Sequence, residues 1–325
     1  MSTLYGIPYM GSKTKIAIDI LRQLPQGNRF VDLFGGGFAM SHAAFLSGRY
    51  REILYNDYNP LIVDLVKGGL KGKYNYGVFQ PKFVTREEFY SQKEKDGYIK
   101  YIWSFGNSGH EYMFSKEIEP LKHMAHDFVV FGRYNNALEQ IAPNIKQAVK
   151  SKNIHDRRME FCGFVRRTAK RFDLQQLEQL ERLQQLEQLE RLQQKEKREQ
   201  LERLERLQQL EQLTRLERLQ QLEQLTRLEK RAITCTNISY LDYDYQDGDI
   251  VYLDPPYEGT AEYSGGFDHK RFYDWAANCA YQIWFSSYKN ISDTRFKMVY
   301  AIKLKSTLGA GNSAVNYECL YTNRG

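Results

Sequence analysis

The fold is decided by residues 249–257, Asp249-Ile250-Val251-Tyr252-Leu253-Asp254-Pro255-Pro256-Tyr257. Residues 249–253 are rich in β-branched and aromatic side chains, which is typical of a buried strand. The two prolines end this strand, because each removes a backbone donor and fixes φ. The sequence thus predicts a carboxylate, a rigid carbonyl-bearing elbow and an aromatic ring at the carboxyl end of a strand, where open α/β sheets bind ligands. These groups suit a planar substrate with an exocyclic amine; an ordinary strand-to-turn transition is the alternative for this motif alone.

A glycine-rich loop follows an earlier strand pattern. Residues 29–40 read Arg-Phe-Val-Asp-Leu-Phe-Gly-Gly-Gly-Phe-Ala-Met and lead into a helical pattern that ends at Ser47. Glycines between a strand and a helix let the backbone approach a ligand that any Cβ would exclude. The loop matches neither GxxxxGK[ST] nor GxGxxG, which disfavours a nucleoside triphosphate or a dinucleotide. For this motif alone, binding of another ligand by Gly35–Gly37 and an ordinary strand-to-helix turn are equal alternatives.

An acid stands at the end of the next predicted strand, residues 52–55. Asn56-Asp57 follows that strand and precedes a predicted helix over residues 61–67. About twenty residues beyond a glycine loop, such an acid can accept hydrogen bonds from ribose hydroxyls. Asp57 can alternatively cap the helix, but its spacing favours the ribose role.

Upstream, Gly-Ser-Lys before a predicted helix over residues 14–24 suits an anionic group, although an ordinary helix start is the alternative.

Composition limits the class of protein. A chain of 325 residues can form one large domain or two. The formal net charge of +6 lies outside residues 174–231, where twelve Glu balance twelve Lys or Arg, and it fits a polyanionic partner. The four cysteines have no CxxC spacing, so we expect reduced thiols and neither zinc nor disulfides. Without a signal run or a stretch of ~18 apolar residues, we expect a cytoplasmic protein that does not enter a membrane.

Residues 71–173 combine aromatic and basic segments. Basic side chains interleaved with aromatics and amides are what phosphate and base-edge contacts require, although aromatics also fill ordinary cores. We therefore predict a nucleic-acid surface here. Its candidate DNA-binding residues are Asn107, Arg133, Arg166, Arg167 and Lys170.

Residues 174–231 form a separate repeat with leucine at almost every third position. The composition favours a helix, but the period of three differs from the ~3.5 of a coiled coil. A 3₁₀-helix or a compact solenoid would align the leucines, so the pitch stays open. We expect a helical insertion generated by tandem duplication, which acts as a spacer or in self-association.

The carboxyl-terminal part continues the strand and helix alternation. We predict a loop over residues 258–268 and a helix over residues 270–281. The predicted strands are residues 233–240, 282–286, 296–303 and 317–321.

With these motifs in order, the chain resembles the Dam-type DNA adenine-N6 methyltransferases of bacteria and phages. Asp254–Tyr257 matches the catalytic tetrapeptide of that family, and residues 318–323 resemble its closing strand. The resemblance implies an α/β, Rossmann-like class I S-adenosylmethionine-dependent methyltransferase sheet. The catalytic domain would comprise residues 1–70 and 232–325, with a mostly helical target-recognition region over residues 71–173 and the repeat inserted over 174–231.

The resemblance also implies which residues act. Asp254, Pro255, Pro256 and Tyr257 would be catalytic. Besides Asp254, the positions that match the cofactor site are Tyr9, Lys13, Asp32, Phe34, Gly35, Gly36, Gly37, Asp57, Ser239 and Tyr240. Ser239 departs from the family, which usually has an acid beside the adenine ring of the cofactor, and the repeat has no counterpart in the minimal enzyme.

The reaction implied is methyl transfer from S-adenosylmethionine to N6 of an adenine flipped out of double-stranded DNA, without a metal. Hydrogen bonds to Asp254 and the Pro255 carbonyl would localise the amine lone pair, and Tyr257 would stack on the base. Methylation of cytosine N4, RNA or a protein amide is one alternative. A non-catalytic DNA-binding scaffold assembled through the repeat is another.

Overall fold

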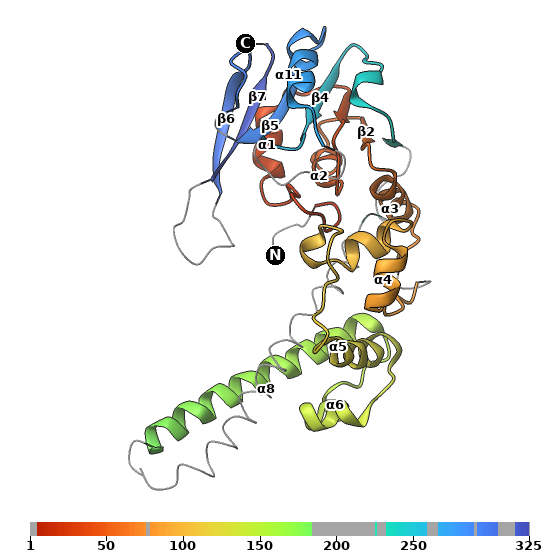
Figure 1. The fold of residues 1–325 in the computed structure, drawn as a ribbon, viewed down its shortest axis with the longest axis vertical. Helices are drawn as coiled ribbons and strands as arrows, with labels where there is room; N and C mark the ends of the chain where they lie inside the picture. Colours follow the sequence, from red (N-terminus) through yellow and green to blue (C-terminus); the bar gives the residue numbers. More distant parts are fainter. Residues whose placement is uncertain are drawn as a thin grey trace. The chain divides into compact units, whose positions relative to one another are not determined.

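The computed structural model describes residues 5–75, 79–183, 225, 232–258, 266–288, 291–304 and 316–324. The chain divides into two compact units (Figure 1), namely Met1–Lys73 with Gln221–Gly325, and Tyr74–Gln220. No helix among the described residues is long and apolar enough to cross a membrane.

The first unit is built on a seven-stranded sheet with the order β3-β2-β1-β4-β5-β7-β6. The five strands from β3 to β5 are parallel, whereas β7 runs antiparallel to both β5 and β6. The strands are β1 (Arg29–Asp32), β2 (Glu52–Asn56), β3 (Ile233–Thr236), β4 (Asp249–Leu253), β5 (Ile283–Tyr288), β6 (Lys297–Leu304) and β7 (Asn316–Thr322).

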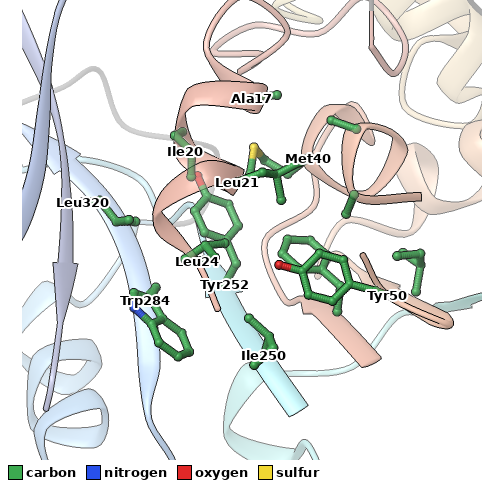
Figure 2. Close-up of a cluster of buried hydrophobic side chains, with 14 of the residues drawn as sticks. Ala17, Ile20, Leu21, Leu24, Met40, Tyr50, Ile250, Tyr252, Trp284 and Leu320 are labelled. Carbon is green, nitrogen blue, oxygen red and sulfur yellow. The ribbon is translucent and has the colours of Figure 1, made fainter. Parts of the chain in front are cut away.

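Helices cover both faces of this sheet. The alternation of side chains along β4 sends Ile250 and Tyr252 into one apolar cluster, and Val251 and Leu253 into another. The first cluster contains α1 (Ala17–Gln23) and α2 (Ala39–Ser47); Figure 2 shows its side chains. The second contains Phe272, Tyr273 and Ala276 of α11 (His269–Asn278). Each fully buried aliphatic side chain contributes ~1.5–3 kcal/mol to the stability of the fold, so the packing on both faces stabilises the sheet.

The strand register positions the functional site. Asp32 at the end of β1 pairs with Tyr55 of β2 and with Tyr252 of β4. The residues that follow these three parallel strands therefore lie along one edge of the sheet. Because β1 lies between β2 and β4, the strand order reverses beside it, and open α/β sheets bind ligands at such a point.

The second unit is helical around an aromatic core that includes the fully buried Phe89, Trp103 and Phe161. In the first unit, α3 (Pro60–Leu70) follows β2 and has Asn59 as its N-cap. Among its described residues, the helices of the second unit are α4 (Arg86–Gln92), α5 (Glu119–His126), α6 (Asn136–Ile141), α7 (Ile145–Ala148) and α8 (Ile154–Leu183). Two π-helical turns lie at Tyr98–Ile102 and Asp127–Phe131, and a 3₁₀ turn lies at Phe105–Asn107.

Several predicted boundaries were wrong. The helix expected from residue 14 begins at Ala17, because the Thr14 hydroxyl accepts a hydrogen bond from the Tyr5 backbone at 2.7 Å and does not cap the helix. The strand expected to reach residue 240 ends at Thr236, and a 3₁₀ turn begins at Tyr240.

The carboxyl-terminal elements also shift. The helix expected to reach residue 281 ends at Asn278, since Cys279 has extended backbone, and β5 continues to Tyr288. Helix α8 runs into the leucine repeat as far as Leu183. The rest of the repeat, apart from Leu225, lies outside the described residues, so its conformation stays a prediction.

Candidate active site

The elbow after β4 carries a carboxylate whose two oxygens are both engaged. The Asp254 Oδ2 lies 2.8 Å from the Lys13 ammonium, and its Oδ1 accepts a hydrogen bond of 3.0 Å from the Tyr257 hydroxyl. The Lys13 ammonium also lies 5.0 Å from the centroid of the Tyr257 ring. Farther along the elbow, His269 Nε2 lies 3.0 Å from the Pro256 carbonyl. The predicted catalytic acid, elbow and aromatic ring therefore form one cluster.

Lys13 reaches this cluster because the amino-terminal segment is anchored on the glycine loop. The backbone N–H of Gly6 donates to His42 Nδ1 at 2.9 Å, and that of Ile7 donates to the Gly37 carbonyl at 2.7 Å. His42 is buried, and burial lowers its pKa to about 4, so it is a neutral acceptor. Lys13, expected at the cofactor, thus contacts the carboxylate of Asp254, the predicted catalytic acid.

Glu318 joins the cluster and was given no role from the sequence. It lies on β7, where its Oε1 accepts a hydrogen bond from the Tyr257 hydroxyl and lies 3.5 Å from the Lys13 ammonium. Glu318 lies on a strand with neighbours on both sides, and its side chain faces the same side of the sheet as the buried Leu320, two residues away. An acid in such a position is the sequence signal that could have identified it.

The glycine loop is packed closely against the protein itself. A Cβ on Gly35 would lie 2.3 Å from the Tyr55 ring, and one on Gly37 would lie 2.6 Å from the Tyr9 Cβ. Gly36 has φ of +43°, and its N–H donates to Asp57 Oδ2 at 2.8 Å. Internal packing alone therefore requires glycine at Gly35 and Gly37, in addition to any approach of a ligand.

Asp32 is a buried acid with one unsatisfied oxygen. Its Oδ2 accepts hydrogen bonds from the Ser41 hydroxyl at 2.7 Å and the Ser41 N–H at 3.2 Å. Its Oδ1 is buried and has no hydrogen-bond partner among the residues that the structure describes. Desolvation raises the pKa of Asp32 to about 7, although the hydrogen bonds from Ser41 act to lower it. An additional donor at Oδ1 would satisfy this oxygen.

Asp57 lies at the end of β2 beside the glycine loop. Its carboxylate accepts N–H bonds of 2.8 Å from both Gly36 and Asn59, and desolvation raises its pKa to about 6. The helix cap that was the alternative role for Asp57 belongs to Asn59, whose side chain accepts from the Leu61 N–H. Each carboxylate oxygen has two acceptor sites, so Asp57 can still accept hydroxyl bonds.

Three further residues expected at the cofactor, Phe34, Ser239 and Tyr240, also have contacts within the protein. The Ser239 hydroxyl accepts from the Leu241 N–H and caps a 3₁₀ turn. Tyr240 packs against Phe34 and Trp275, with ring centroids 5.3 Å and 4.8 Å away. Phe34 and Tyr240 thus belong to the apolar layer around α11.

Exposed apolar side chains adjoin Asp57 and were also missed from the sequence. Tyr58 is 79% exposed and Ile238 is 37% exposed. Asn56 holds the backbone of Ile238 with hydrogen bonds of 2.9 Å and 3.0 Å, and Asn237 donates to the Asp57 carbonyl at 2.7 Å. The exposed tyrosine directly after the acid is the signal that could have identified this apolar surface.

The comparison with protein families decides the class. A family model for the D12 class of N6 adenine-specific DNA methyltransferases matches residues 9–307, which include the glycine loop and the elbow. The chain belongs to this family. The prediction of an adenine-N6 DNA methyltransferase is therefore confirmed, and the mixed α/β sheet agrees with the predicted class I methyltransferase fold. No individual curated protein matches the chain.

As a D12-class methyltransferase, the protein acts on DNA, and its candidate DNA contacts lie in the second unit. Arg133, Arg166 and Arg167 are exposed, and the Arg133 guanidinium lies 4.7 Å from the centroid of the Phe131 ring. Lys170 lies on α8. DNA binding by these residues stays a prediction.

Asn107, the other candidate in the second unit, has a structural role in its turn. Its φ is +58°, a left-handed conformation that asparagine tolerates better than most residues. Its side-chain amide donates to the Tyr101 carbonyl at 2.8 Å. The remaining amide hydrogen and the carbonyl oxygen are what Asn107 can offer to a base edge.

Proposed function

We propose that this D12-class enzyme transfers the methyl group of S-adenosylmethionine to N6 of an adenine flipped out of duplex DNA. The observation that carries the proposal is the arrangement at one sheet edge of Asp32, Asp57 and the Asp254 cluster, at the ends of three neighbouring parallel strands. Asp32 and Asp57, which would bind the cofactor, thus lie at the same edge as Asp254, which would accept hydrogen bonds from the substrate amine.

The residues at the ends of β1 and β2 fit S-adenosylmethionine. The unsatisfied Oδ1 of Asp32 needs a hydrogen-bond donor, which the ammonium group of the cofactor would supply. Asp57 would accept bonds from the ribose hydroxyls, and the exposed Tyr58 and Ile238 would contact the adenine ring of the cofactor. The cofactor supplies a methyl group activated by its bond to a positively charged sulfur.

Asp254 and the Pro255 carbonyl would activate the adenine amine. The lone pair of this nitrogen is delocalised into the ring, so the amine is a poor nucleophile. Two hydrogen bonds donated to fixed acceptors draw the nitrogen towards tetrahedral geometry and stabilise the positive charge that develops on it. A strand end and two prolines hold both acceptors, which favours this preorganisation.

The base must leave the duplex, because an amine inside the stack cannot reach a donor in a protein site. Unstacking costs a few kcal/mol, and stacking on the Tyr257 ring would offset part of this cost. Contacts between phosphates and Arg133, Arg166, Arg167 and Lys170 would contribute the rest.

Equilibrium binding of S-adenosylmethionine tests the cofactor assignment. We expect Asp32→Asn to weaken binding roughly 10- to 100-fold, because a hydrogen bond between charged groups is lost. The matched control is Asp64→Asn, which changes an exposed aspartate of α3. Equal dissociation constants for wild type and Asp32→Asn would contradict the role of Asp32.

A further inference from the structure

Glu318 is a carboxyl buried inside the sheet. It lies on β7 between β5 and β6, and only 4% of its surface is exposed. Burial raises its pKa, and a buried carboxylate is costly unless polar or charged partners compensate for the lost water. Its partners therefore indicate what this carboxyl does.

These partners come from the sheet on one side and from the active site on the other. Ser286 of β5 lowers the pKa of the Glu318 carboxyl, against the effect of burial, and the hydroxyls of Ser286 and Tyr252 lie 2.7 Å apart in the core. On the opposite side, the Glu318 carboxyl accepts from the Tyr257 hydroxyl and lies 3.5 Å from the Lys13 ammonium. Pairing of β7 with β5 and β6 on either side thus holds this carboxyl against the elbow.

The Tyr257 hydroxyl has two carboxyl acceptors but only one proton. It lies 3.0 Å from Asp254 Oδ1 and is also bonded to Glu318 Oε1. A phenol donates a single hydrogen bond, so it can donate to only one carboxylate at a time. Each Asp254 oxygen has two acceptor sites, and Lys13 and the Tyr257 hydroxyl each take one of them, so the hydroxyl weakens Asp254 as an acceptor for the adenine amine.

Glu318 can remove this competition without movement of the ring. Rotation of the O–H bond from Asp254 to Glu318 returns one acceptor site of Asp254 Oδ1 to the amine, since the second acceptor is already within bonding distance. A neutral amide at position 318 would be the weaker acceptor, and the hydroxyl would stay on the Asp254 carboxylate.

We propose that Glu318 is a positioning residue for the methyl transfer, which takes the Tyr257 hydroxyl and shares the Lys13 ammonium so that Asp254 is open to the adenine amine. This inference rests on the proposed role of Asp254 as the acceptor for that amine. It assigns Glu318 a role in turnover through Tyr257 and Lys13, without contact with the substrate.

The first test compares Glu318→Gln with Glu258→Gln in steady-state methyl transfer to unmethylated DNA. Glu258 directly follows the tetrapeptide and binds the exposed Ser292 at 2.6 Å, so its variant is a matched control outside the cluster. We expect Glu318→Gln to lower kcat roughly 10- to 100-fold and Glu258→Gln to leave it unchanged. The KM values for DNA and cofactor should change less than about threefold, because the preorganised acceptor acts mainly in the transition state. A kcat within about threefold of wild type would overturn the proposal.

The second test is rescue. Tyr257→Phe keeps the stacking ring but removes the competing hydroxyl, so Tyr257→Phe combined with Glu318→Gln should be several-fold more active than Glu318→Gln alone. A merely structural role predicts no rescue, and a double variant no better than Glu318→Gln would refute the competition. If Glu318→Gln does not fold, Ser286→Ala replaces it. This variant removes the hydroxyl that lowers the pKa of Glu318, and an unchanged kcat would reject the proposal.

Wild type and Asp254→Asn are assayed first to separate the two proposals. No methyl transfer by wild type, or full activity of Asp254→Asn, would reject the proposed role of Asp254 and with it this inference. An active wild type, an inactive Asp254→Asn and a normal Glu318→Gln would reject only the role of Glu318.

Discussion

Asp32→Asn should stabilise the protein increasingly as the pH rises. The buried carboxyl has a pKa of about 7 when folded and an ordinary value of 3.8, so the folded state holds the proton more tightly than the unfolded state. Stability from this group is therefore complete below pH 3.8 and is lost as the pH rises through 7. The neutral amide of the variant has no such loss, and its carbonyl can still accept both bonds from Ser41.

The two pKa values set the magnitude of this effect. Ionisation of Asp32 costs the folded state roughly 2 kcal/mol at pH 5 and roughly 4 kcal/mol at pH 8, as upper bounds. The free energy of unfolding of Asp32→Asn should thus rise relative to wild type by roughly 2–3 kcal/mol between these two pH values. Effects of other titrating groups cancel in the comparison between the two proteins.

Urea unfolding at pH 5, 6, 7 and 8 measures this difference. The exposed Asp64→Asn of α3 serves as the control, and its curve should stay parallel to that of wild type. A difference between Asp32→Asn and wild type that does not change with pH would refute the desolvation of Asp32. The same variant should lose cofactor affinity, so gained stability and lost binding would have one physical cause.

Three further variants test separate parts of the structure. Gly35→Ala brings a Cβ within 2.3 Å of the Tyr55 ring and should lower the free energy of unfolding by ~1–3 kcal/mol in urea titrations. The control Gly163→Ala, within α8, should not lower the free energy of unfolding. Lys13→Met should lower kcat by about tenfold or more while the Kd for S-adenosylmethionine changes less than about threefold, because the ammonium contacts Asp254 and Glu318; a selective loss of cofactor binding would contradict this. Arg166→Ala with Arg167→Ala should reduce the slope of log affinity for DNA against log salt concentration by about 1–2, and an unchanged slope would remove both residues from the phosphate contacts.

The sheet around the elbow could be predicted because its local signals agree. Strand β4 has the predicted bounds, since an apolar run meets two prolines, and α2 ends at the predicted Ser47, where Gly48 takes φ of +66°. The start of α1 could not be predicted, because the hydroxyl that would cap it is bound by Tyr5, nine residues away. Boundaries fixed by such tertiary contacts leave no local pattern.

The site was predictable as a set of positions but not as a set of contacts. The ends of β1, β2 and β4 meet as their order implies, which brings Asp32, Asp57 and Asp254 to one edge. The partner of Lys13 depends on how the amino-terminal segment folds over the glycine loop, and no spacing encodes that path. Glu318 is distant in sequence, and only the placement of β7 beside β5 brings it to the elbow.

Methyl transfer itself is the most direct measurement of the central claim. Wild type and Asp254→Ala are incubated with methyl-labelled S-adenosylmethionine and unmethylated bacterial DNA, and the DNA is then digested to nucleosides. We expect label in N6-methyladenine with wild type and none with Asp254→Ala. Absence of transfer despite cofactor binding, label in methylcytosine, or full activity of Asp254→Ala would contradict the account.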